Sequence, residues 1–233
     1  MKRFLLLIFL VCCAANILFE WNNYQIGIYI SKPLLMPLLL AWFYAANATH
    51  WSAFYQWIAI GFVFSFGGDT LLMFVENDPP RAAFFLYGLI SFLFAHLCYL
   101  VAFWKHTPTQ KGLVEQQPAW LIAFAVVLVG NILILWPGLP QALQIPVGIY
   151  SSVIVLMGVS ALNLYKKIPQ RAARTIFWGA LLFILSDSLI GLNKFRSDAF
   201  TIPYVRVLIM LFYLAGQYLI AKGASLFSES PYQ

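Results

Sequence analysis

Charged side chains are scarce in this sequence. Only 9% of its 233 residues are Asp, Glu, Lys or Arg, whereas soluble domains carry about 25%. Hydrophobic residues instead make up 62% of the chain and aromatic residues 18%. This composition excludes an ordinary soluble domain and is typical of a protein with several membrane-spanning segments.

The charges that are present do not form a nucleic-acid-binding patch. The net charge is +6, from 14 Lys and Arg against 8 Asp and Glu. The cations are spread thinly over the links between apolar runs, which indicates a signal for membrane topology. A nucleic acid is therefore not an expected partner, because its phosphates need clustered cations.

The sequence also gives no indication of a metal site or of disulfide bonds. All three cysteines lie within apolar runs, and their spacing suits neither a disulfide framework nor a metal-binding pair: Cys12, Cys13 and Cys98. The three histidines are widely separated, which argues against a buried zinc site: His50, His96 and His106. We expect no metal ion and no cofactor.

Eight apolar runs are separated by short polar or proline-containing links. Most are long enough to cross a hydrocarbon core of about 30 Å at about 1.5 Å per residue. The expected fold is all-α, a polytopic membrane helix bundle of about eight transmembrane helices in one integral membrane domain, residues 1–233. The helices are expected at about 4–20, 26–45, 55–75, 82–104, 119–136, 142–165, 175–193 and 202–221.

The distribution of the cations predicts the orientation of these helices. The first run resembles a signal peptide but lacks a small-x-small cleavage site, so we interpret it as an uncleaved helix. Eight crossings place both termini on one side, and assigning that side to the cytoplasm gives it most of the Lys and Arg residues. We therefore expect cytoplasmic termini in a multi-pass protein of a bacterial inner membrane.

Three ionisable residues share one depth in this topology. Asp69 of "FSFGGDTLLMF", Asp187 of "LLFILSDSLIGLNKF" and Lys32 of "YISKPLLMPLLL" each lie about 9 Å below the outer end of their helix. Ionisable residues at such depth usually face a cavity or mark a functional site. The alternative is an ion pair that only fastens helices, although Lys32 would leave one aspartate without a charge partner.

Other polar residues are candidate substrate-binding groups. Tyr150 reaches near the carboxylate layer, and Tyr213 and Gln217 share a helix face because they are four residues apart. His96 lies near the depth of Gln217. A hydrogen bond between these two buried side chains is the alternative to a role in binding.

A cluster of polar residues is expected at the outer mouth of the helices. It consists of Asn193, Lys194, Arg196 and Arg206. Its cations suit a lipid phosphate, although snorkelling to the membrane surface explains them almost as well.

Two aspartates in a partly dry pocket suit acid–base chemistry. A serine hydrolase is not indicated, because G-x-S-x-G is absent and no histidine lies near the carboxylate layer. Two neighbouring carboxyl groups do not ionise equally, so one can stay protonated as an acid while the other stays ionised.

Five segments also resemble, in order over almost the whole chain, the successive signatures of the YhhN-like lysoplasmalogenase family. They are "SKPLLMPLLL", "FSFGGDTLLM", "FFLYGLISFLFAHLCYL", "GALLFILSDSLIGLNKF" and "LFYLAGQYLI". The resemblance implies a multi-pass membrane enzyme without a cofactor. Its lysophospholipid substrate is a lysoplasmalogen, whose vinyl ether bond it cleaves to a fatty aldehyde and glycerophospho-ethanolamine or -choline.

The resemblance also assigns roles to residues of this chain. Asp69 and Asp187 match the catalytic aspartates of the family, and its other polar positions match Lys32, His96, Tyr213 and Gln217. A vinyl ether is hydrolysed by proton transfer to carbon, which needs a carboxylic acid and a carboxylate near the developing positive charge. Which aspartate is the acid stays open.

Two other classes of protein fit the same residues. A multi-pass transporter, or a lipid- or small-molecule-binding protein, would use the Lys–Asp layer to bind a polar solute. Prolines interrupt two expected helices, as in many transporters, but no internal repeat is evident. In a structural membrane protein, the layer would serve assembly alone.

Overall fold

The computed structural model describes residues 1–74 and 79–228 of the chain. These residues form nine α-helices, two short 3-10 helices and no strand. Seven of the helices in this described part are long and apolar enough to cross a membrane. The expected all-α polytopic fold is confirmed, and the chain is an integral multi-pass membrane protein. The orientation of its termini stays a prediction.

Among the described residues, seven of the eight expected spans are candidates by length and hydropathy, and one helix is not. Helix α3 (Ala53–Leu72) has 20 residues but is not among the seven candidate spans. Its polar residues Gln56, Asp69 and Thr70 lower the mean hydropathy of an otherwise apolar segment. The expected end of this helix, near Val75, lies outside the described residues.

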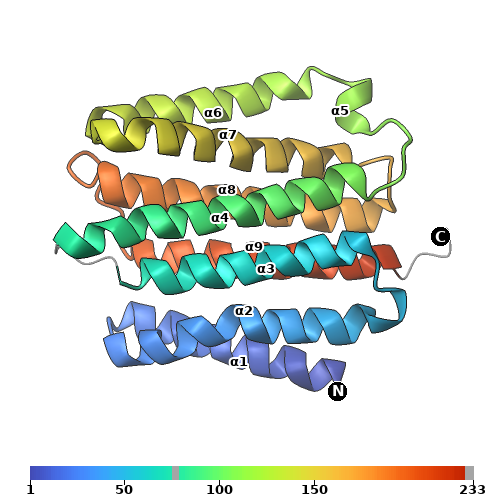
Figure 1. Cartoon of the computed structure of the whole chain (residues 1–233), viewed down its shortest axis with the longest axis horizontal. Coiled ribbons are helices and arrows are strands. Elements are labelled where there is room, and N and C mark those ends of the chain that lie inside the picture. The colour runs from blue at the N-terminus through green and yellow to red at the C-terminus, as the bar shows by residue number, and fades with distance from the viewer. Residues whose placement is uncertain (75–78, 229–233) are drawn as a thin grey trace. The chain divides into compact units, whose positions relative to one another are not determined.

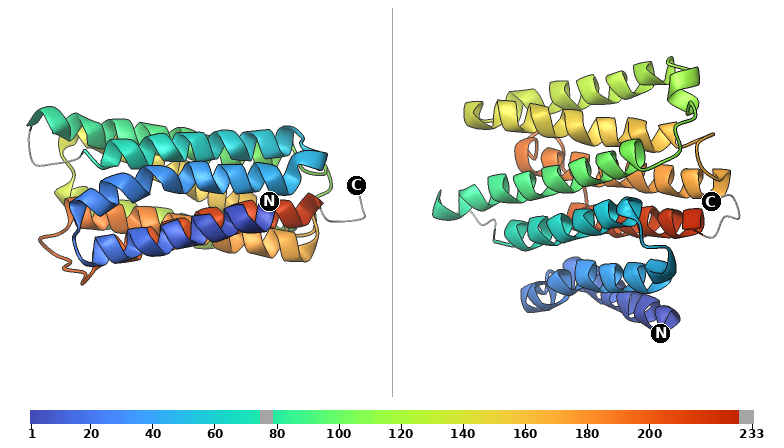
Figure 2. Two further views of the ribbon diagram at one scale, coloured as in Figure 1. Left: turned by 90° about the horizontal axis from the view of Figure 1, so that it is seen from below. Right: turned by 45° about the vertical axis from the view of Figure 1, so that its right-hand side comes forward.

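The helices fall into two compact units, Met1–His106 and Thr107–Gln233. In the N-terminal unit, helices that follow one another in sequence pack together: α1 on α2, α2 on α3 and α3 on α4. Figure 1 shows these helices, and the turn between α1 and α2 is also seen in Figure 2. Besides α3, the elements are α1 (Lys2–Trp21), α2 (Gln25–Asn47), the 3-10 helix η1 (Ala48–His50) and α4 (Pro79–Lys105).

Small residues bring α3 and α4 close together beside Asp69. A Cβ atom added to Gly67 would lie 2.7 Å from Ser91 Oγ, and one added to Gly88 would lie 2.8 Å from the Leu72 side chain. The Ser91 hydroxyl donates a hydrogen bond of 2.7 Å to the Phe64 carbonyl. Close approach at small residues is the usual way in which helices associate in membranes.

The C-terminal unit is built around two long antiparallel helices, α8 and α9. Helix α7 packs on α8, and α6 packs on both α7 and α8. Figure 1 and the right-hand view of Figure 2 show α6 and α7 side by side. The elements are α5 (Leu113–Gln116), α6 (Trp120–Leu135), the 3-10 helix η2 (Trp136–Gly138), α7 (Gln141–Asn163), α8 (Gln170–Phe195) and α9 (Val205–Ser228).

Glycines allow the backbones of α8 and α9 to touch. A Cβ atom on Gly179 would lie 2.8 Å from the Gly216 carbonyl oxygen, and one on Gly216 would lie 2.9 Å from the Gly179 carbonyl oxygen. Next along the same interface, the rings of Phe183 and Tyr213 meet edge to face at 5.4 Å between centroids. These contacts set the register of α9, and thereby the depth of its polar residues, against α8.

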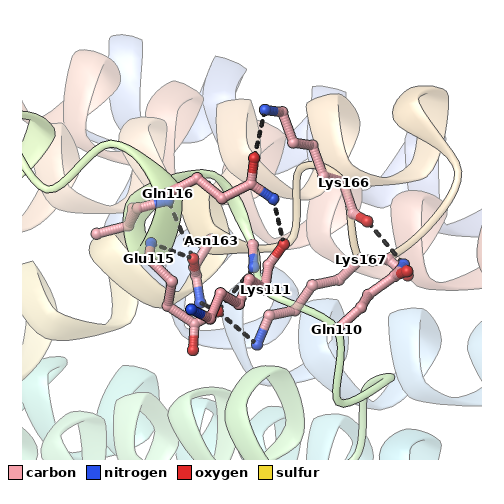
Figure 3. Close-up of polar contacts among 9 residues, drawn as sticks. Gln110, Lys111, Glu115, Gln116, Asn163, Lys166 and Lys167 are labelled. Carbon is pink, nitrogen blue, oxygen red and sulfur yellow. Dashed lines mark hydrogen bonds and ion pairs between the residues drawn. The ribbon is translucent and has the colours of Figure 1, made fainter.

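A network of polar contacts joins α5 to the turn between α7 and α8 (Figure 3). Glu115 Oε2 accepts hydrogen bonds from the Gly112 backbone N–H at 2.7 Å and from Asn163 Nδ2 at 3.1 Å, and lies 3.3 Å from Lys167 Nζ. The Gly112 hydrogen bond, the Asn163 side chain and Lys167 together lower the pKa of Glu115 below its ordinary value of 4.5. We call Gly112, Glu115, Asn163 and Lys167 the loop clamp.

Glycine is required in the loop clamp. A Cβ atom on Gly112 would lie 1.9 Å from the Asn163 carbonyl oxygen, which no adjustment of a side chain can relieve. Asn163 Oδ1 in turn accepts the backbone N–H groups of Val114 and Glu115, at 3.0 and 3.2 Å. Two of the donors left open at the start of α5 are thereby satisfied.

Candidate functional site

Asp187 lies in α8 between two serines, and each of these three residues contacts a different neighbouring helix. We call Ser186, Asp187 and Ser188 the SDS segment. Consecutive residues of an α-helix point about 100° apart, because 3.6 residues make one turn. Three adjacent residues of α8 therefore reach α9, α7 and α6.

Tyr150 of α7 donates its hydroxyl hydrogen bond to Asp187 Oδ2. Only 8% of Tyr150 is exposed, and Asp187 is half-buried. Sequence reasoning placed both residues near one layer but gave Tyr150 a role in substrate binding. In the structure the Tyr150 hydroxyl is directed to the Asp187 carboxylate, and this hydrogen bond can hold the carboxylate in a fixed orientation.

The two serines connect the same segment to α9 and α6. Ser186 Oγ donates to the Ile209 carbonyl at 3.0 Å. Ser188 Oγ donates to the Ile184 carbonyl at 2.8 Å and accepts a hydrogen bond of 2.7 Å from Asn131 Nδ2 of α6. Hydrogen bonds between helices hold polar groups in an apolar membrane interior.

The bond between Ser186 and Ile209 also gives the depth of the polar residues of α9. Tyr213 lies four residues beyond Ile209, about 6 Å along the helix from the level of the SDS segment. Gln217 lies one turn further, at about 12 Å. Both side chains are buried. Tyr213 and Gln217 thus lie about one and two helical turns from the level of Asp187, and their role in the site stays a prediction.

The expected outer cluster contains one cation with a structural function. The Arg196 guanidinium donates to the Ile134 carbonyl near the end of α6, and it lies 3.6 Å from Asp198 Oδ1. It also stands 5.7 Å from the centre of the Phe200 ring. These contacts explain Arg196 without a lipid phosphate. Asn193, Lys194 and Arg206 are exposed.

In the N-terminal unit, Asp69 and Lys32 lie at a similar level. The Tyr29 hydroxyl of α2 donates to the Met73 carbonyl at 3.4 Å. Lys32 lies three residues after Tyr29, which is about 4.5 Å along the axis of α2. Asp69 lies four residues before Met73, which is about 6 Å along the axis of α3. Only 3% of Asp69 is exposed, and Lys32 is half-buried. Their common depth in the membrane stays a prediction.

The remaining candidate of this unit is His96, which is fully buried on α4. Its neighbour Ala95 and the nearby Tyr99 are buried as well, and a Cβ atom on Gly61 of α3 would lie 2.4 Å from the Tyr99 ring. His96 is therefore on the tightly packed side of α4. Its expected hydrogen bond to Gln217 stays a prediction.

Sequence reasoning missed two asparagine–serine pairs. In the N-terminal unit, Asn16 Nδ2 donates to Ser31 Oγ at 2.9 Å, and Ser31 Oγ donates to the Gly27 carbonyl at 2.7 Å. Asn131 and Ser188 repeat this arrangement in the C-terminal unit. A signal for Asn131 existed in the sequence, because it is the one amide side chain in the apolar segment "WLIAFAVVLVGNILIL".

No metal centre is formed by these residues. Within residues 1–74 and 79–228, the structure has no group of three or more His, Cys, Asp or Glu side chains placed to hold a metal ion. The polar atoms available at the SDS segment are those of a carboxylate, a phenol, two hydroxyls and an amide. They can donate, accept and transfer protons without a metal ion.

Comparison with known proteins decides the family. The profile of the YhhN family matches residues 27–224. The chain belongs to the YhhN family. The resemblance found in the sequence is thereby confirmed, and every candidate site residue lies inside the matched range.

Several relatives of this YhhN-family chain carry the name lysoplasmalogenase. Lysoplasmalogenase TMEM86A of Bos taurus is 34% identical over 175 residues, which cover 72% of this chain and 64% of the relative. The lysoplasmalogenase of Mycobacterium bovis is 30% identical over 185 residues, covering 76% of this chain and 63% of the relative. This chain therefore spans less than two thirds of each of these relatives. No solved structure gives a significant match.

Proposed function

We propose that this YhhN-family chain is a lysoplasmalogenase, a membrane hydrolase that cleaves the vinyl ether bond of a lysoplasmalogen. The products are a fatty aldehyde and glycerophospho-ethanolamine or -choline. The observation that carries the proposal is the similarity, over 72–76% of this chain, to relatives with that name. The membrane in question is proposed to be a bacterial inner membrane.

The reaction begins with a proton. A carboxylic acid transfers it to the alkene carbon remote from the ether oxygen, and the adjacent carbon and oxygen then share the positive charge of an oxocarbenium ion. Water adds to that carbon and gives up a proton to a carboxylate. The resulting hemiacetal breaks its bond to the glycerol oxygen, which takes the proton from the second carboxyl group, while the hemiacetal hydroxyl returns a proton to the first carboxylate and becomes the aldehyde. One water molecule is consumed, and the acid is regenerated.

Asp187 suits the role of the carboxylate in this sequence. The Tyr150 hydroxyl donates to Asp187 Oδ2, which holds this half-buried carboxylate in one orientation. A fixed carboxylate stabilises a nearby cation without having to reorganise during the reaction. Asp69, almost fully buried on α3, then supplies the proton.

The other candidate residues surround the substrate in this proposal. Lys32 organises charge near a carboxylate or the lipid phosphate, and Asn193 meets the headgroup. Tyr213, Gln217 and His96 line the deeper part of the site, where the chain of the lipid lies. The substrate enters from the bilayer, because the linkage of a single-chain lipid lies just beneath the membrane surface.

The decisive experiment measures aldehyde release by the purified protein in nanodiscs supplied with a vinyl-ether lysolipid. We expect release by the wild type, and a loss of about 10²–10⁴-fold in Asp69→Asn and in Asp187→Asn. The double variant should be barely worse than the poorer single one, because residues that act as a unit are not additive.

The control uses the asparagine variants themselves. Asparagine is nearly the size of aspartate and carries no charge, so both variants should accumulate in the membrane as the wild type does. Binding of the lysolipid without aldehyde release by the wild type would favour a transporter or a binding protein. Near-normal turnover in both asparagine variants would give the aspartates a purely structural role.

A further inference from the structure

Asn131 lies beside the SDS segment, and the proposed reaction has not given it a role. It is half-buried on α6, whose other side chains are apolar or aromatic and are mostly exposed on the outside of the helix. An amide at this position is costly for a membrane helix unless it has polar partners. One partner is known, the hydroxyl of Ser188.

The hydrogen bonds of Ser188 determine how the Asn131 amide is turned. The single hydroxyl proton of Ser188 is donated to the Ile184 carbonyl, so Ser188 Oγ can only accept from Asn131. An amide donates through Nδ2 and accepts through Oδ1. The Nδ2 end must therefore face Ser188, and Oδ1 points away from it as an oriented acceptor.

This acceptor has no donor within the described part of the protein. Nδ2 makes the hydrogen bond that the structure gives to Asn131, and among residues 1–74 and 79–228 none donates to Oδ1. Oδ1 is not enclosed either, since it is not among the fully buried polar atoms that lack a hydrogen-bond partner. This oxygen therefore keeps some accessible surface on a half-buried residue.

The position of Ser188 on α8 relates Asn131 to the carboxylate of Asp187. Ser188, which anchors Asn131, follows Asp187 directly, and consecutive Cα atoms lie about 3.8 Å apart. Asp187 and the serine that holds Asn131 are thus neighbours on α8, with the carboxylate directed to α7 and the serine to α6. A ligand that contacts both residues needs a group that reacts at the carboxylate and a hydrogen-bond donor for the amide oxygen.

The substrate class of the proposed function has that arrangement. The vinyl ether oxygen is on C1 of the glycerol, and a free hydroxyl is on C2. An amide oxygen accepts only, so it cannot bind a phosphate or an ester carbonyl. The donors of a lysolipid are this hydroxyl and, in some headgroups, an ammonium that lies beyond the phosphate and far from the ether.

We propose that Asn131 Oδ1 accepts the hydrogen bond of the free C2 hydroxyl, and that Asn131 thereby selects single-chain lipids over two-chain lipids. This inference rests on the proposed function for the identity of the substrate. In a two-chain lipid an ester replaces the hydroxyl and leaves Oδ1 without a donor. Sites built to bind a hydroxyl reject analogues that lack it.

The test measures binding, so that it does not depend on catalysis. The ligands are a saturated 1-O-alkyl lysophosphatidylcholine, which has no vinyl ether to cleave, and the same lipid with a methyl group on the C2 oxygen. For the wild type in phosphatidylcholine nanodiscs we expect about 3–10-fold tighter binding of the free hydroxyl. Asn131→Leu should bind the two lipids equally, and Asn131→Ala should do the same if the leucine variant does not accumulate.

A matched control is available in the N-terminal unit. Asn16→Leu removes the same kind of asparagine–serine–carbonyl chain, so it tests for a general effect of losing an interhelical hydrogen bond. It should keep the preference of the wild type. A preference that persists in the Asn131 variants, or that is absent from the wild type, overturns the inference.

The same variants separate this inference from the proposed function. If the wild type releases no aldehyde from a vinyl-ether lysolipid yet shows a preference that depends on Asn131, the recognition stands and the hydrolase proposal fails. If Asn131→Leu instead slows vinyl-ether turnover equally for hydroxyl and methoxy substrates and keeps the binding preference, Asn131 serves the attacking water and the inference is wrong.

Discussion

Replacing Tyr150 with phenylalanine removes one hydroxyl from the interface of α7 and α8 and leaves the ring. Tyr150 is 8% exposed, so water does not readily replace the hydrogen bond to Asp187 Oδ2. A hydrogen bond to a charged group contributes about 1.5–3 kcal/mol. If Asp187 must be held in place in the transition state, Tyr150→Phe raises the activation free energy by the whole of this contribution.

The expected result is a fall in kcat of about 10–150-fold, because each 1.36 kcal/mol or so changes a rate tenfold. KM should change little, since in this proposal the hydroxyl positions Asp187 and does not bind the lipid. The assay is aldehyde release at saturating lysolipid. Phenylalanine introduces no polar atom, so the variant should accumulate normally in the membrane.

Tyr29→Phe is the matched control. The Tyr29 hydroxyl also joins two helices, but its hydrogen bond to the Met73 carbonyl is 3.4 Å long and its side chain is 37% exposed. Its loss should leave kcat within about twofold, as expected for a partly exposed hydrogen bond. An unchanged kcat in Tyr150→Phe would refute the positioning of Asp187, and a raised KM alone would return Tyr150 to the substrate-binding role predicted from the sequence.

Three further predictions concern charge and topology. Lys32→Met should lower activity strongly while the protein still accumulates, and loss of the protein from the membrane would instead indicate a role in the scaffold. A cysteine at Gln170 should be labelled only from the cytoplasm, so labelling from outside alone would reverse the topology. Because the loop clamp lowers the pKa of Glu115, the carboxylate stabilises the fold above pH 4.5 and loses this effect as pH falls below it. The Tm difference between wild type and Glu115→Gln should accordingly shrink at acid pH, and a difference that is constant with pH would contradict the assignment.

The sequence by itself determined the class of the protein and the positions of most helices. Crossing a membrane needs an apolar segment of sufficient length, and that is a property of consecutive residues. Asp69 and Asp187 are conspicuous for the same reason, since a carboxylate in an apolar run is costly wherever the helix packs. The successive motifs were also enough to identify the YhhN family. The hydropathy of α3, which contains Asp69, falls short of that of the seven candidate spans, and this too is a property of its residues.

The partners of these residues were decided by the tertiary structure. Tyr150 and Asp187 are 37 residues apart in sequence, Asn131 and Ser188 are 57 apart, and Arg196 and Ile134 are 62 apart. Whether such residues meet depends on the rotation of each helix about its axis and on its register against its neighbours. In the C-terminal unit, contacts such as Gly179 against Gly216 set that register. A polar residue in an apolar run shows that a partner is needed, and packing between distant segments determines which residue it is.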